Sequence, residues 1–373
     1  MSAGLRAGYK QTEVGVIPED WCVEYIEDIA QITTGSKNTQ DRTADGQFPF
    51  FVRSQTVERI NSYSFDGEAI LTAGDGVGTG KVFHYINGKF DAHQRVYRIS
   101  NFSDRANGFY FYLYFSTNFY NRIMQMTAKS SVDSVRREMI SRMVIPLPPT
   151  DVEQRAIAAA LSDMDALLGG LDSLIAKKRD LKQAAIQQLL TGQTRLPGFC
   201  GEWEVKRLGD LSPLQRGFDL LTSRLRPGPY PVVYSNGVSS YHNEFMVKGP
   251  GVVTGRSGTI GNVHFVEGDY WPHNTSLWVT SFKGNSPRFI FYLLSSLGLD
   301  RFSTGSGVPT LNRNDVHEHR VLVPPTEAEQ TTIATILSDM DTELAALQAR
   351  RDKTQNLKQA MMQELLTGRI RLI

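Results

Sequence analysis

A long internal repeat constrains this chain more than any other feature of its sequence. Residues 145–192 recur in a closely similar form at residues 321–368, and the two copies align without a gap. Aligning Pro149 with Pro325 gives an offset of 325 − 149 = 176 residues. A repeat of this length implies that the chain builds the same long element twice.

Each copy predicts a long helix with a defined start and stop. Two prolines keep the preceding chain extended, so that Thr150 becomes the N-cap and Glu153 completes a capping box. Gly192 supplies the C-terminal stop. At ~1.5 Å per residue, roughly forty residues make a rod of about 60 Å, far longer than the usual helix of ~11–12 residues. The second copy repeats these residues as Thr326, Glu329 and Gly368.

Apolar residues recur in both helices at alternating spacings of three and four, the pattern of a coiled-coil seam. The register loosens near Lys178 and Arg351. We expect it to resume at Leu181, Ala185 and Leu189 in the first copy and at Leu357, Met361 and Leu365 in the second. Packing seam against seam buries both, and the connectivity then makes the pair antiparallel; burial in two separate cores is the alternative. The predicted packing residues are Ile157, Leu161, Met164, Leu168, Leu171 and Ile175, with Ile333, Leu337, Met340, Leu344 and Leu347.

The segments between the helices are repeated as well, since the run from Trp21 to Ala30 aligns with the run from Trp203 to Ser212. Short β-branched and aromatic runs bounded by Gly, Asn and Asp predict strands. An aromatic-rich helical stretch follows in each part, at 109–116 and 288–296. The predicted strands are 48–52, 68–73, 81–86 and 95–100, then 230–234, 251–255, 262–266 and 276–280.

The expected fold class is therefore α+β, with two similar recognition domains and two long antiparallel coiled-coil helices. The domains are residues 1–149 and 196–325, and the helical regions are residues 150–195 and 326–373. Such an arrangement has pseudo-twofold symmetry. It is also nearly circular, because the segment leading to Trp21 supplies the continuation that the second helix lacks.

Composition and motifs narrow the functional classes. The net charge of +1 neither favours nor excludes a polyanionic partner. Cys22 and Cys200 lack metal-ligand spacing, so we expect no zinc site, no disulfide framework and a reducing cytoplasm. There is no signal peptide, and no apolar run approaches the ~20 residues of a membrane span, so we expect no membrane association.

The glycine-rich stretch 74–81 invites comparison with a phosphate-binding loop, but it fails the pattern. Asp75 occupies the place of the first glycine, and Val82 follows the lysine where Ser or Thr would bind magnesium. We expect a tight turn between strands instead. His93 and His273 occupy matching places and are expected to be structural hydrogen-bonding residues. No catalytic signature is recognisable, so we expect no active site, metal or cofactor.

Polar loops before the long helices and after matching strands suggest a nucleic-acid surface. Hydroxyl and cationic groups suit phosphate oxygens, while Asn and Gln can pair with adenine and Arg with guanine. A solvated loop remains the alternative for any one residue, but equivalent loops in two domains favour a long repetitive ligand. The candidates are Arg53, Ser54, Gln55, Lys129, Ser130 and Arg136, then Tyr234, Asn236, Arg256, Ser257, Ser306, Thr310, Asn312 and Arg313.

Several motifs carry a family resemblance that covers essentially the whole chain. IPLPPTDVEQ and VLVPPTEAEQ open the helices, LKQAAIQQLLTG and LKQAMMQELLTG close them, and YKQTEVGVIPEDW and RLPGFCGEWEVKRLGDL precede the domains. With these motifs the chain resembles the specificity subunit of type I restriction-modification systems. The resemblance implies that each domain reads half of a bipartite site in double-stranded DNA. It also implies that the helices hold two adenine-methylating modification subunits, set the half-site spacing, and engage restriction subunits through the complex.

Two other functions remain open on the sequence. A structural adaptor could display two protein- or sugar-binding domains on its helices, and it would lack the steep salt dependence of DNA binding. The recognition half of a single-chain restriction enzyme is the other, and the lack of catalytic motifs argues against it.

Overall fold

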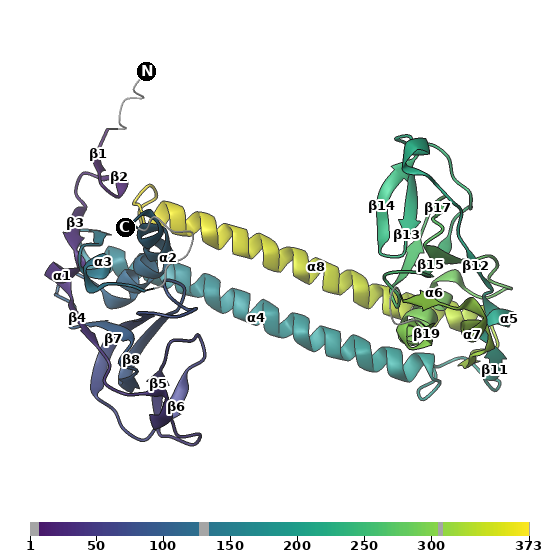
Figure 1. The fold of residues 1–373 in the computed structure, drawn as a ribbon, viewed down its shortest axis with the longest axis horizontal. Coiled ribbons are helices and arrows are strands. Elements are labelled where there is room, and N and C mark those ends of the chain that lie inside the picture. Colours follow the sequence, from purple (N-terminus) through teal and green to yellow (C-terminus); the bar gives the residue numbers. More distant parts are fainter. Residues whose placement is uncertain (1–6, 127–133, 305–308, 373) are drawn as a thin grey trace. The chain divides into compact units, whose positions relative to one another are not determined.

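The computed structural model describes residues 7–126, 134–304 and 309–372, and its elements are labelled in Figure 1. The chain divides into two compact units. Unit 1 comprises Met1–Gly170 and Arg351–Ile373, and unit 2 comprises Leu171–Arg350. Each unit therefore contains one globular part together with segments of both long helices.

A six-stranded sheet of order β4-β9-β7-β8-β5-β6 forms the body of unit 1. Its paired strands are antiparallel except β5 and β8, which run parallel where Phe50 faces Asp91. The strands are β4 (Gln31–Thr34), β5 (Phe48–Phe51), β6 (Glu58–Ile60), β7 (Phe65–Ala73), β8 (Phe83–Ala92) and β9 (Val96–Ser100).

Shorter elements complete unit 1 around this sheet. The hairpin of β1 and β2 stands near the start of the chain, and β3 pairs with β10 just before the first long helix. These elements are β1 (Tyr9–Thr12), β2 (Gly15–Pro18), β3 (Cys22–Tyr25), α1 (Ile26–Ile29), η1 (Thr39–Asp41), α2 (Gly108–Met126), α3 (Arg137–Ser141) and β10 (Val144–Leu147).

The aromatic helix α2 supplies much of the core of unit 1. Phe111, Phe115 and Phe119 recur at intervals of four, which places them on one face of the helix. All three are fully buried and belong to the same cluster as Ile70 and Ile99 of the sheet. The aromatic run thus explains why this face of the sheet is covered.

Unit 2 repeats the plan with one change in its sheets. β16 and β17 take the place of the single long β8, so the strands form two sheets, β12-β18-β15-β16 and β14-β13-β17. The parallel pairing is kept, now between β13 and β17. The strands are β12 (Leu214–Arg216), β13 (Tyr230–Tyr234), β14 (Gly237–His242), β15 (Gly251–Gly255), β16 (Val263–Val266), β17 (Trp271–Pro272) and β18 (Ser276–Val279).

Several of the remaining elements of unit 2 match elements of unit 1 in order. β11 pairs with β21 as β3 pairs with β10, and α6 follows the sheet as α2 does. They are β11 (Glu204–Arg207), α5 (Leu208–Leu211), η2 (Thr222–Arg224), α6 (Pro287–Ser296), η3 (Leu299–Phe302), β19 (Ser303–Thr304), β20 (Thr310–Leu311), α7 (Arg313–Glu318) and β21 (Arg320–Val323).

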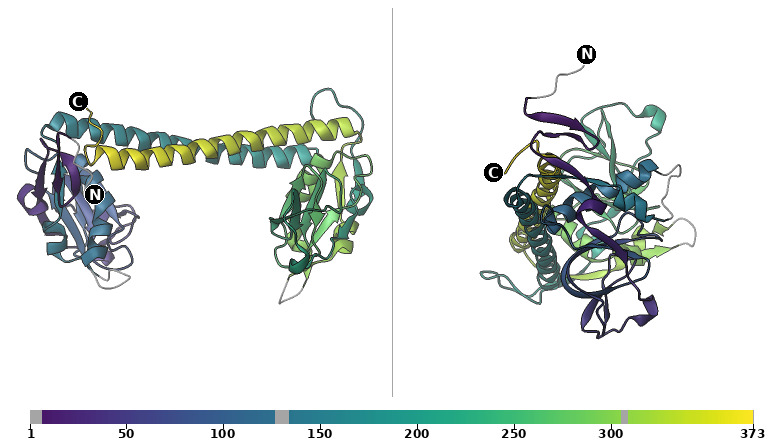
Figure 2. Two further views of the ribbon diagram at one scale, coloured as in Figure 1. Left: turned by 90° about the horizontal axis from the view of Figure 1, so that it is seen from above. Right: turned by 90° about the vertical axis from the view of Figure 1, so that its left-hand side faces the viewer.

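The two repeated segments form α4 (Asp151–Leu190) and α8 (Glu327–Leu365), as predicted. The parts of α4 and α8 that belong to unit 1 lie side by side (Figure 2). There, Lys358 near the end of α8 pairs with Asp165 near the start of α4. In unit 2, Lys182 pairs with Asp341 in the same sense. Both pairs join the beginning of one helix to the end of the other, so the helices are antiparallel and the predicted α+β fold is confirmed.

Most of the predicted seam is buried. Ile157, Leu161, Leu168, Leu171, Ile175, Ile333 and Leu337 are buried, and Met164, Met340, Leu344 and Leu347 are partly buried. The expected return of the register is wrong at Leu181 and Leu357, because these leucines are 47% and 53% exposed. It is confirmed further on, where Leu189 and Leu365 are buried and Ala185 and Met361 are partly buried. Lys182 and Lys358 each reach an aspartate on the other helix. Neighbouring helical residues point about 100° apart, so the preceding leucine faces outward.

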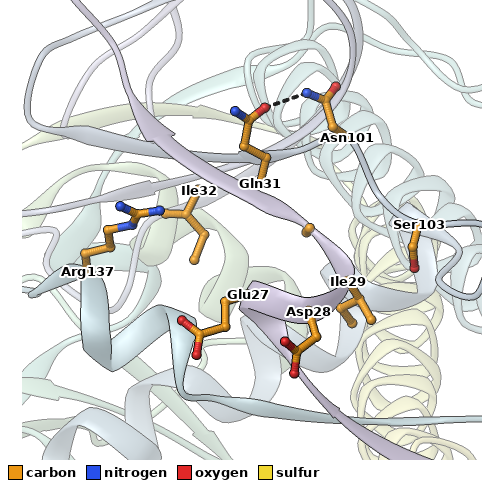
Figure 3. Close-up of a pocket in the computed structure, with 9 residues that line it drawn as sticks. Glu27, Asp28, Ile29, Gln31, Ile32, Asn101, Ser103 and Arg137 are labelled. Atoms are coloured by element: carbon orange, nitrogen blue, oxygen red, sulfur yellow. Dashed lines mark hydrogen bonds between the residues drawn. The ribbon is translucent and has the colours of Figure 1, made fainter.

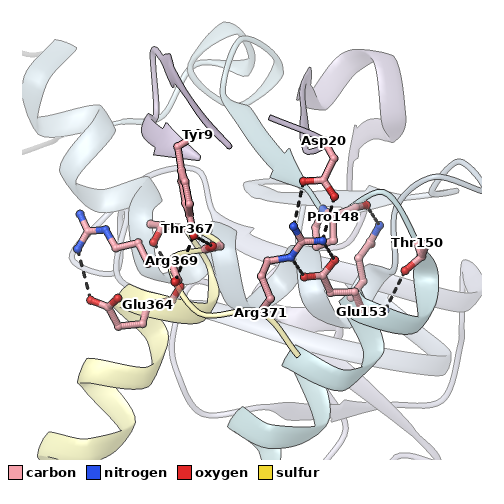
Figure 4. Close-up of polar contacts among 11 residues, drawn as sticks. Tyr9, Asp20, Pro148, Thr150, Glu153, Glu364, Thr367, Arg369 and Arg371 are labelled. Atoms are coloured by element: carbon pink, nitrogen blue, oxygen red, sulfur yellow. Dashed lines mark hydrogen bonds and ion pairs between the residues drawn. The ribbon is translucent and has the colours of Figure 1, made fainter. Parts of the chain in front are cut away.

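The two ends of the chain meet in unit 1, which confirms the expected near-circular arrangement there. The Tyr9 hydroxyl donates to the Gly368 carbonyl at 3.2 Å, and Arg371 pairs with Asp20 at 2.9 Å (Figure 4). Arg371 also binds the buried carboxylate of Glu153. The N-terminal segment therefore packs where the chain would otherwise continue.

Unit 2 builds the same arrangement from continuous chain. Arg195 pairs with the buried Glu329 at 2.8 Å, and the Trp203 indole donates to the same carboxylate at 3.1 Å. In both units only half of the predicted capping box forms. Thr150 and Thr326 accept from the backbone N–H groups of Glu153 and Glu329, but the two carboxylates bind arginines.

The described residues were compared with three further expectations, which concern disulfides, metal sites and membrane-spanning helices. Both cysteines are free. Within the described ranges, no three His, Cys, Asp or Glu side chains gather where a metal ion could bind. None of the helices traced in those ranges has both the length and the apolar content needed to cross a bilayer.

Candidate nucleic-acid interface

Five segments that are distant in sequence meet in unit 1. The glycine-rich turn after β7 pairs with the loop before α3, since Val135 donates its N–H to the Gly74 carbonyl at 2.7 Å. The turn between β8 and β9 joins the end of β5 through a hydrogen bond from the His93 N–H to Phe51. It also joins the segment after β4 through Lys37. Predicted site residues are thereby brought together.

Two arginines surround one carboxylate in this cluster. Arg53 Nη1 lies 2.7 Å from Asp75 Oδ1, and Arg95 Nε lies 3.7 Å from Asp75 Oδ2. The Arg53 and Asp75 side chains are 45% and 27% exposed. The cluster carries more positive than negative charge and remains accessible, which suits a polyanionic ligand.

The stretch 74–81 is a tight turn between strands, as expected. Gly76 and Gly80 have φ angles of +83° and +68°, which side-chain-bearing residues rarely adopt. A Cβ on Gly78 would approach the Arg53 carbonyl to 2.7 Å. The glycines therefore allow the turn to lie close against the residue that carries the first candidate cation.

His93 and His273 hydrogen-bond within their own turns, as expected for structural residues. His93 Nδ1 accepts from the Arg95 N–H at 3.0 Å, and His273 Nδ1 lies 3.0 Å from the Thr275 hydroxyl. Burial lowers the pKa of both imidazoles. For His93 the Arg53 charge lowers the pKa further, and the Asp75 charge opposes this.

Unit 2 brings the equivalent segments together with the same backbone contacts. Leu311 donates its N–H to the Arg256 carbonyl at 2.8 Å, and Ser257 pairs with Thr310. His273 donates its N–H to Val233 at 2.9 Å. The matched hydrogen bonds place Arg256 and Ser257 where unit 1 has Gly74 and Asp75.

The polar groups of the unit 2 cluster differ from those of unit 1. Arg216 Nη2 lies 2.8 Å from Asp219 Oδ1, and the Asn274 amide donates to the same oxygen. Arg256 Nη1 donates to the Asn274 carbonyl at 3.3 Å. The Tyr234 ring lies over His273, with 4.3 Å between ring centroids.

The remaining predicted residues in the described ranges are exposed, and three of them also form hydrogen bonds within their own loops. Gln55, Arg136 and Arg313 are exposed. The Ser54 hydroxyl donates to Thr56, the Asn236 amide oxygen accepts from Ser239, and Asn312 caps α7 by accepting from Asn314. Lys129, Ser130 and Ser306 lie outside the described residues.

The sequence reasoning missed several residues of these clusters. In the sequence, Asp75 was used only as evidence against a phosphate-binding loop. Four further residues were not predicted as site residues: Arg95, Arg216, Asp219 and Asn274. Arg95 and Asn274 each stand within two residues of a matched histidine, and that proximity was the available signal. Their side chains come from the β8–β9 turn and from its equivalent in unit 2.

A pocket of about 370 Å³ in unit 1 lies at the start of β4 and the end of β9 (Figure 3). It is lined by Glu27, Asp28, Gln31, Asn101 and Arg137, among others, and the Asn101 amide donates to Gln31 at 2.6 Å. Two carboxylates in its wall repel phosphate groups. We therefore assign the interface to the Arg53 cluster rather than to this pocket.

Comparison with known proteins identifies the class of domain. Residues 18–176 and 201–356 each match the type I restriction modification DNA specificity domain. The EcoDI specificity subunit of Escherichia coli is 30% identical over 169 residues, which cover 45% of this chain and 36% of that subunit. The MjaVIII specificity subunit of Methanocaldococcus jannaschii is 22% identical, over 95% of this chain and 94% of that subunit.

Solved structures show the same fold. The type I S subunit of M. genitalium superposes with a TM-score of 0.68 at 18% identity, covering 92% of this chain and 96% of that chain. A chain from a structural study of complex assembly in a type I R-M system gives a TM-score of 0.58 at 13% identity. That match covers 95% of this chain and 99% of that chain.

Proposed function

The chain belongs to the type I restriction-modification DNA specificity family, and from this premise we propose that each of its domains reads one half of a bipartite site in double-stranded DNA. One observation supports this proposal above the others. The same backbone hydrogen bonds and bridges form in both units, but the polar side chains of these segments differ between the two copies.

DNA fits this combination of constant framework and variable side chains. The phosphate backbone is the same at every position, whereas the base edges change with sequence. Arginines in each unit can donate hydrogen bonds to phosphate oxygens and to base edges. They are Arg53 and Arg95 in unit 1, and Arg216 and Arg256 in unit 2. Equivalent loops with unlike side chains are what two different half-sites require.

We further propose that α4 and α8 bind two methyltransferase subunits, and that restriction and translocase subunits join through the assembled complex. Leu174 and Leu181 support this, because both are exposed and stand seven residues apart on one face of α4. Exposed apolar positions at that spacing provide a second seam for helices of a partner. The chain would then contribute recognition to an adenine-specific methyltransferase and endonuclease without an active site of its own.

The two continuous helices would also set the spacing between the half-sites. Each helix contributes residues to both units. A change in helix length therefore changes the number of helical residues between the two clusters. Because the proposed ligand is cellular or incoming DNA, the site of action would be the cytoplasm.

Selection from random double-stranded DNA by the complex with methyltransferase subunits tests this function. We expect two unlike half-sites with a fixed gap, and binding that weakens steeply with added salt because counterions are released. Equal binding of all sequences in the presence of the partner subunits would contradict the proposal. A structural adaptor would show no salt-dependent DNA binding at all.

A further inference from the structure

Each cation cluster contains one carboxylate, but the two carboxylates stand on different segments. In unit 1 it is Asp75, on the glycine-rich turn, and the equivalent residue of unit 2 is Ser257. In unit 2 it is Asp219, which follows β12 and accepts from Asn274. Asn38 occupies that second place in unit 1, where its amide oxygen accepts from Gln94 at 2.6 Å. The charged and neutral residues are thus exchanged between the two units.

The contacts of Asp75 indicate that it orients other side chains and does not itself contact bases. Its two oxygens face different arginines, Oδ1 toward Arg53 and Oδ2 toward Arg95. The hydrogen bond from Arg53 and the longer ion pair with Arg95 make these two arginines the partners of the carboxylate within unit 1. The Arg53 guanidinium, by contrast, has five N–H donors, and one of them contacts Asp75.

The backbone around Asp75 fixes the direction in which it holds Arg53. The turn is braced by the hydrogen bond from Val135 to Gly74 and by the pairing of Asp75 with Ser134. A Cβ placed on Gly76 would lie 3.8 Å from Arg53 Nη1, so the turn runs directly beside the guanidinium. An arginine held in this way loses less conformational entropy when it binds.

We propose that Asp75 and Asp219 are positioning residues that set base preference, each in its own half-site. Asp75 orients Arg53 toward the N7 and O6 acceptors of a guanine read by unit 1. Asp219 orients Arg216 and Asn274 toward base edges read by unit 2. The proposal rests on the proposed function, because it concerns the same two clusters.

A carboxylate at a DNA-binding surface also weakens the affinity for DNA. It repels phosphate groups, so it weakens binding to every sequence unless its arginines reach their correct partners. Removing it should strengthen non-specific binding and reduce discrimination together. A residue with only a structural role would not produce that combination.

Two substitutions that replace each aspartate by the residue of the other unit test the proposal. Asp75→Ser and Asp219→Asn are introduced separately, and each complex with methyltransferase subunits is used to select from random DNA. Asp75→Ser should reduce discrimination at one position of one half-site by about tenfold to a hundredfold. Asp219→Asn should do the same in the other half-site only, so each variant carries an unaltered half-site as its internal control.

The matched control is Asp66→Asn, which removes one negative charge at an exposed position near the start of β7. It should leave both half-sites unchanged. Arg53→Ala should lose discrimination at the same position as Asp75→Ser, and the double variant should lose no more, because the two residues act as a unit. Thermal unfolding of each variant checks that the fold is retained.

The outcomes separate this inference from the function on which it rests. Unchanged base preference in Asp75→Ser, or an equal loss in Asp66→Asn, would overturn the role of Asp75. Loss at both half-sites from one substitution would also overturn it. If the unsubstituted complex selects no bipartite sequence, the proposed function itself is wrong.

Discussion

At the scale of single residues, buried carboxylates join the ends of the long helices to the domains. Glu153 and Glu329 occupy equivalent positions, and each is bound by an arginine that follows the other helix. Burying a charge is unfavourable unless it is paired and hydrogen-bonded. The arginine is therefore as important to each junction as the carboxylate that it binds.

Arg195→Ala should destabilise the protein, because it leaves Glu329 buried with a single indole donor. Glu329 is only 1% exposed, and removing one partner of a buried ion pair costs about 3–5 kcal/mol. Chemical denaturation measures the loss. Arg207→Ala is the control, since Arg207 pairs with Glu318 at the surface and should change the free energy of unfolding by about 0–1 kcal/mol. Equal effects would contradict the assignment.

The partly buried His317 should make stability depend on pH. His317 Nε2 accepts from the Leu214 N–H at 2.8 Å, so this nitrogen is unprotonated in the folded state. Burial, together with the Arg313 charge, lowers its pKa below 6.5. The unfolded chain therefore binds the proton first as the pH falls, and stability drops below about pH 6.5. Thermal unfolding from pH 7 to pH 5 should show a smaller decrease in His317→Gln.

The sequence allowed the candidate cations Arg53 and Arg256 to be found, because both stand beside turns that follow strands. It did not reveal the carboxylates that hold arginines in these clusters. The contact between Asp75 and Arg53 spans 22 residues, and it forms only when the turn after β7 meets the end of β5. Such pairs depend on strand order, which no local pattern encodes.

At the scale of elements, the repeated helices were the most predictable part of the chain. The N-cap and C-terminal glycine signals predicted their bounds, and the periodicity predicted most of their buried face, because apolar spacing reports directly on helix packing. It failed at Leu181 and Leu357, where lysines take the inward direction to reach aspartates. The strand runs were also found, whereas other strands were missed, among them β4, β12 and β14, which contain polar residues.

Leu337→Ala should destabilise the packing of the helices in unit 2. Leu337 is fully buried among Leu189, Leu190 and Ile333, and truncating a buried leucine typically costs about 2–5 kcal/mol. Leu357→Ala is the matched control on the same helix, where an exposed leucine should contribute within about 0.5 kcal/mol. Equal losses in chemical denaturation would show that the exposed leucine also packs.

At the scale of the whole molecule, the chain joins the same parts in two ways. Unit 2 runs continuously from the end of α4 through Arg195 to Trp203, whereas unit 1 assembles the equivalent region from the two chain ends. The arginine–glutamate pair is common to both versions although the connectivity differs, whereas the Trp203 indole bonds the glutamate and the buried Trp21 indole does not. Unit 1 therefore demonstrates that the region folds without a covalent connection.

A circular permutant should consequently fold. We expect a chain opened between Gly198 and Phe199, with a flexible linker from Ile373 to Met1, to keep the cooperative unfolding of the parent protein. Opening the chain between Ala69 and Ile70 in the buried middle of β7 should instead abolish folding. If circular dichroism shows that the permutant opened between Gly198 and Phe199 is not folded, the two junctions are not equivalent.

The length of the helix pair provides the most direct test of the central claim that it fixes the distance between two DNA-reading clusters. Inserting seven residues at facing positions in both α4 and α8 preserves the seam and adds about 10 Å. The partner-bound complex should then select the same two half-sites, with a gap widened by about 3 base pairs at ~3.4 Å each. An unchanged gap between intact half-sites would contradict the claim.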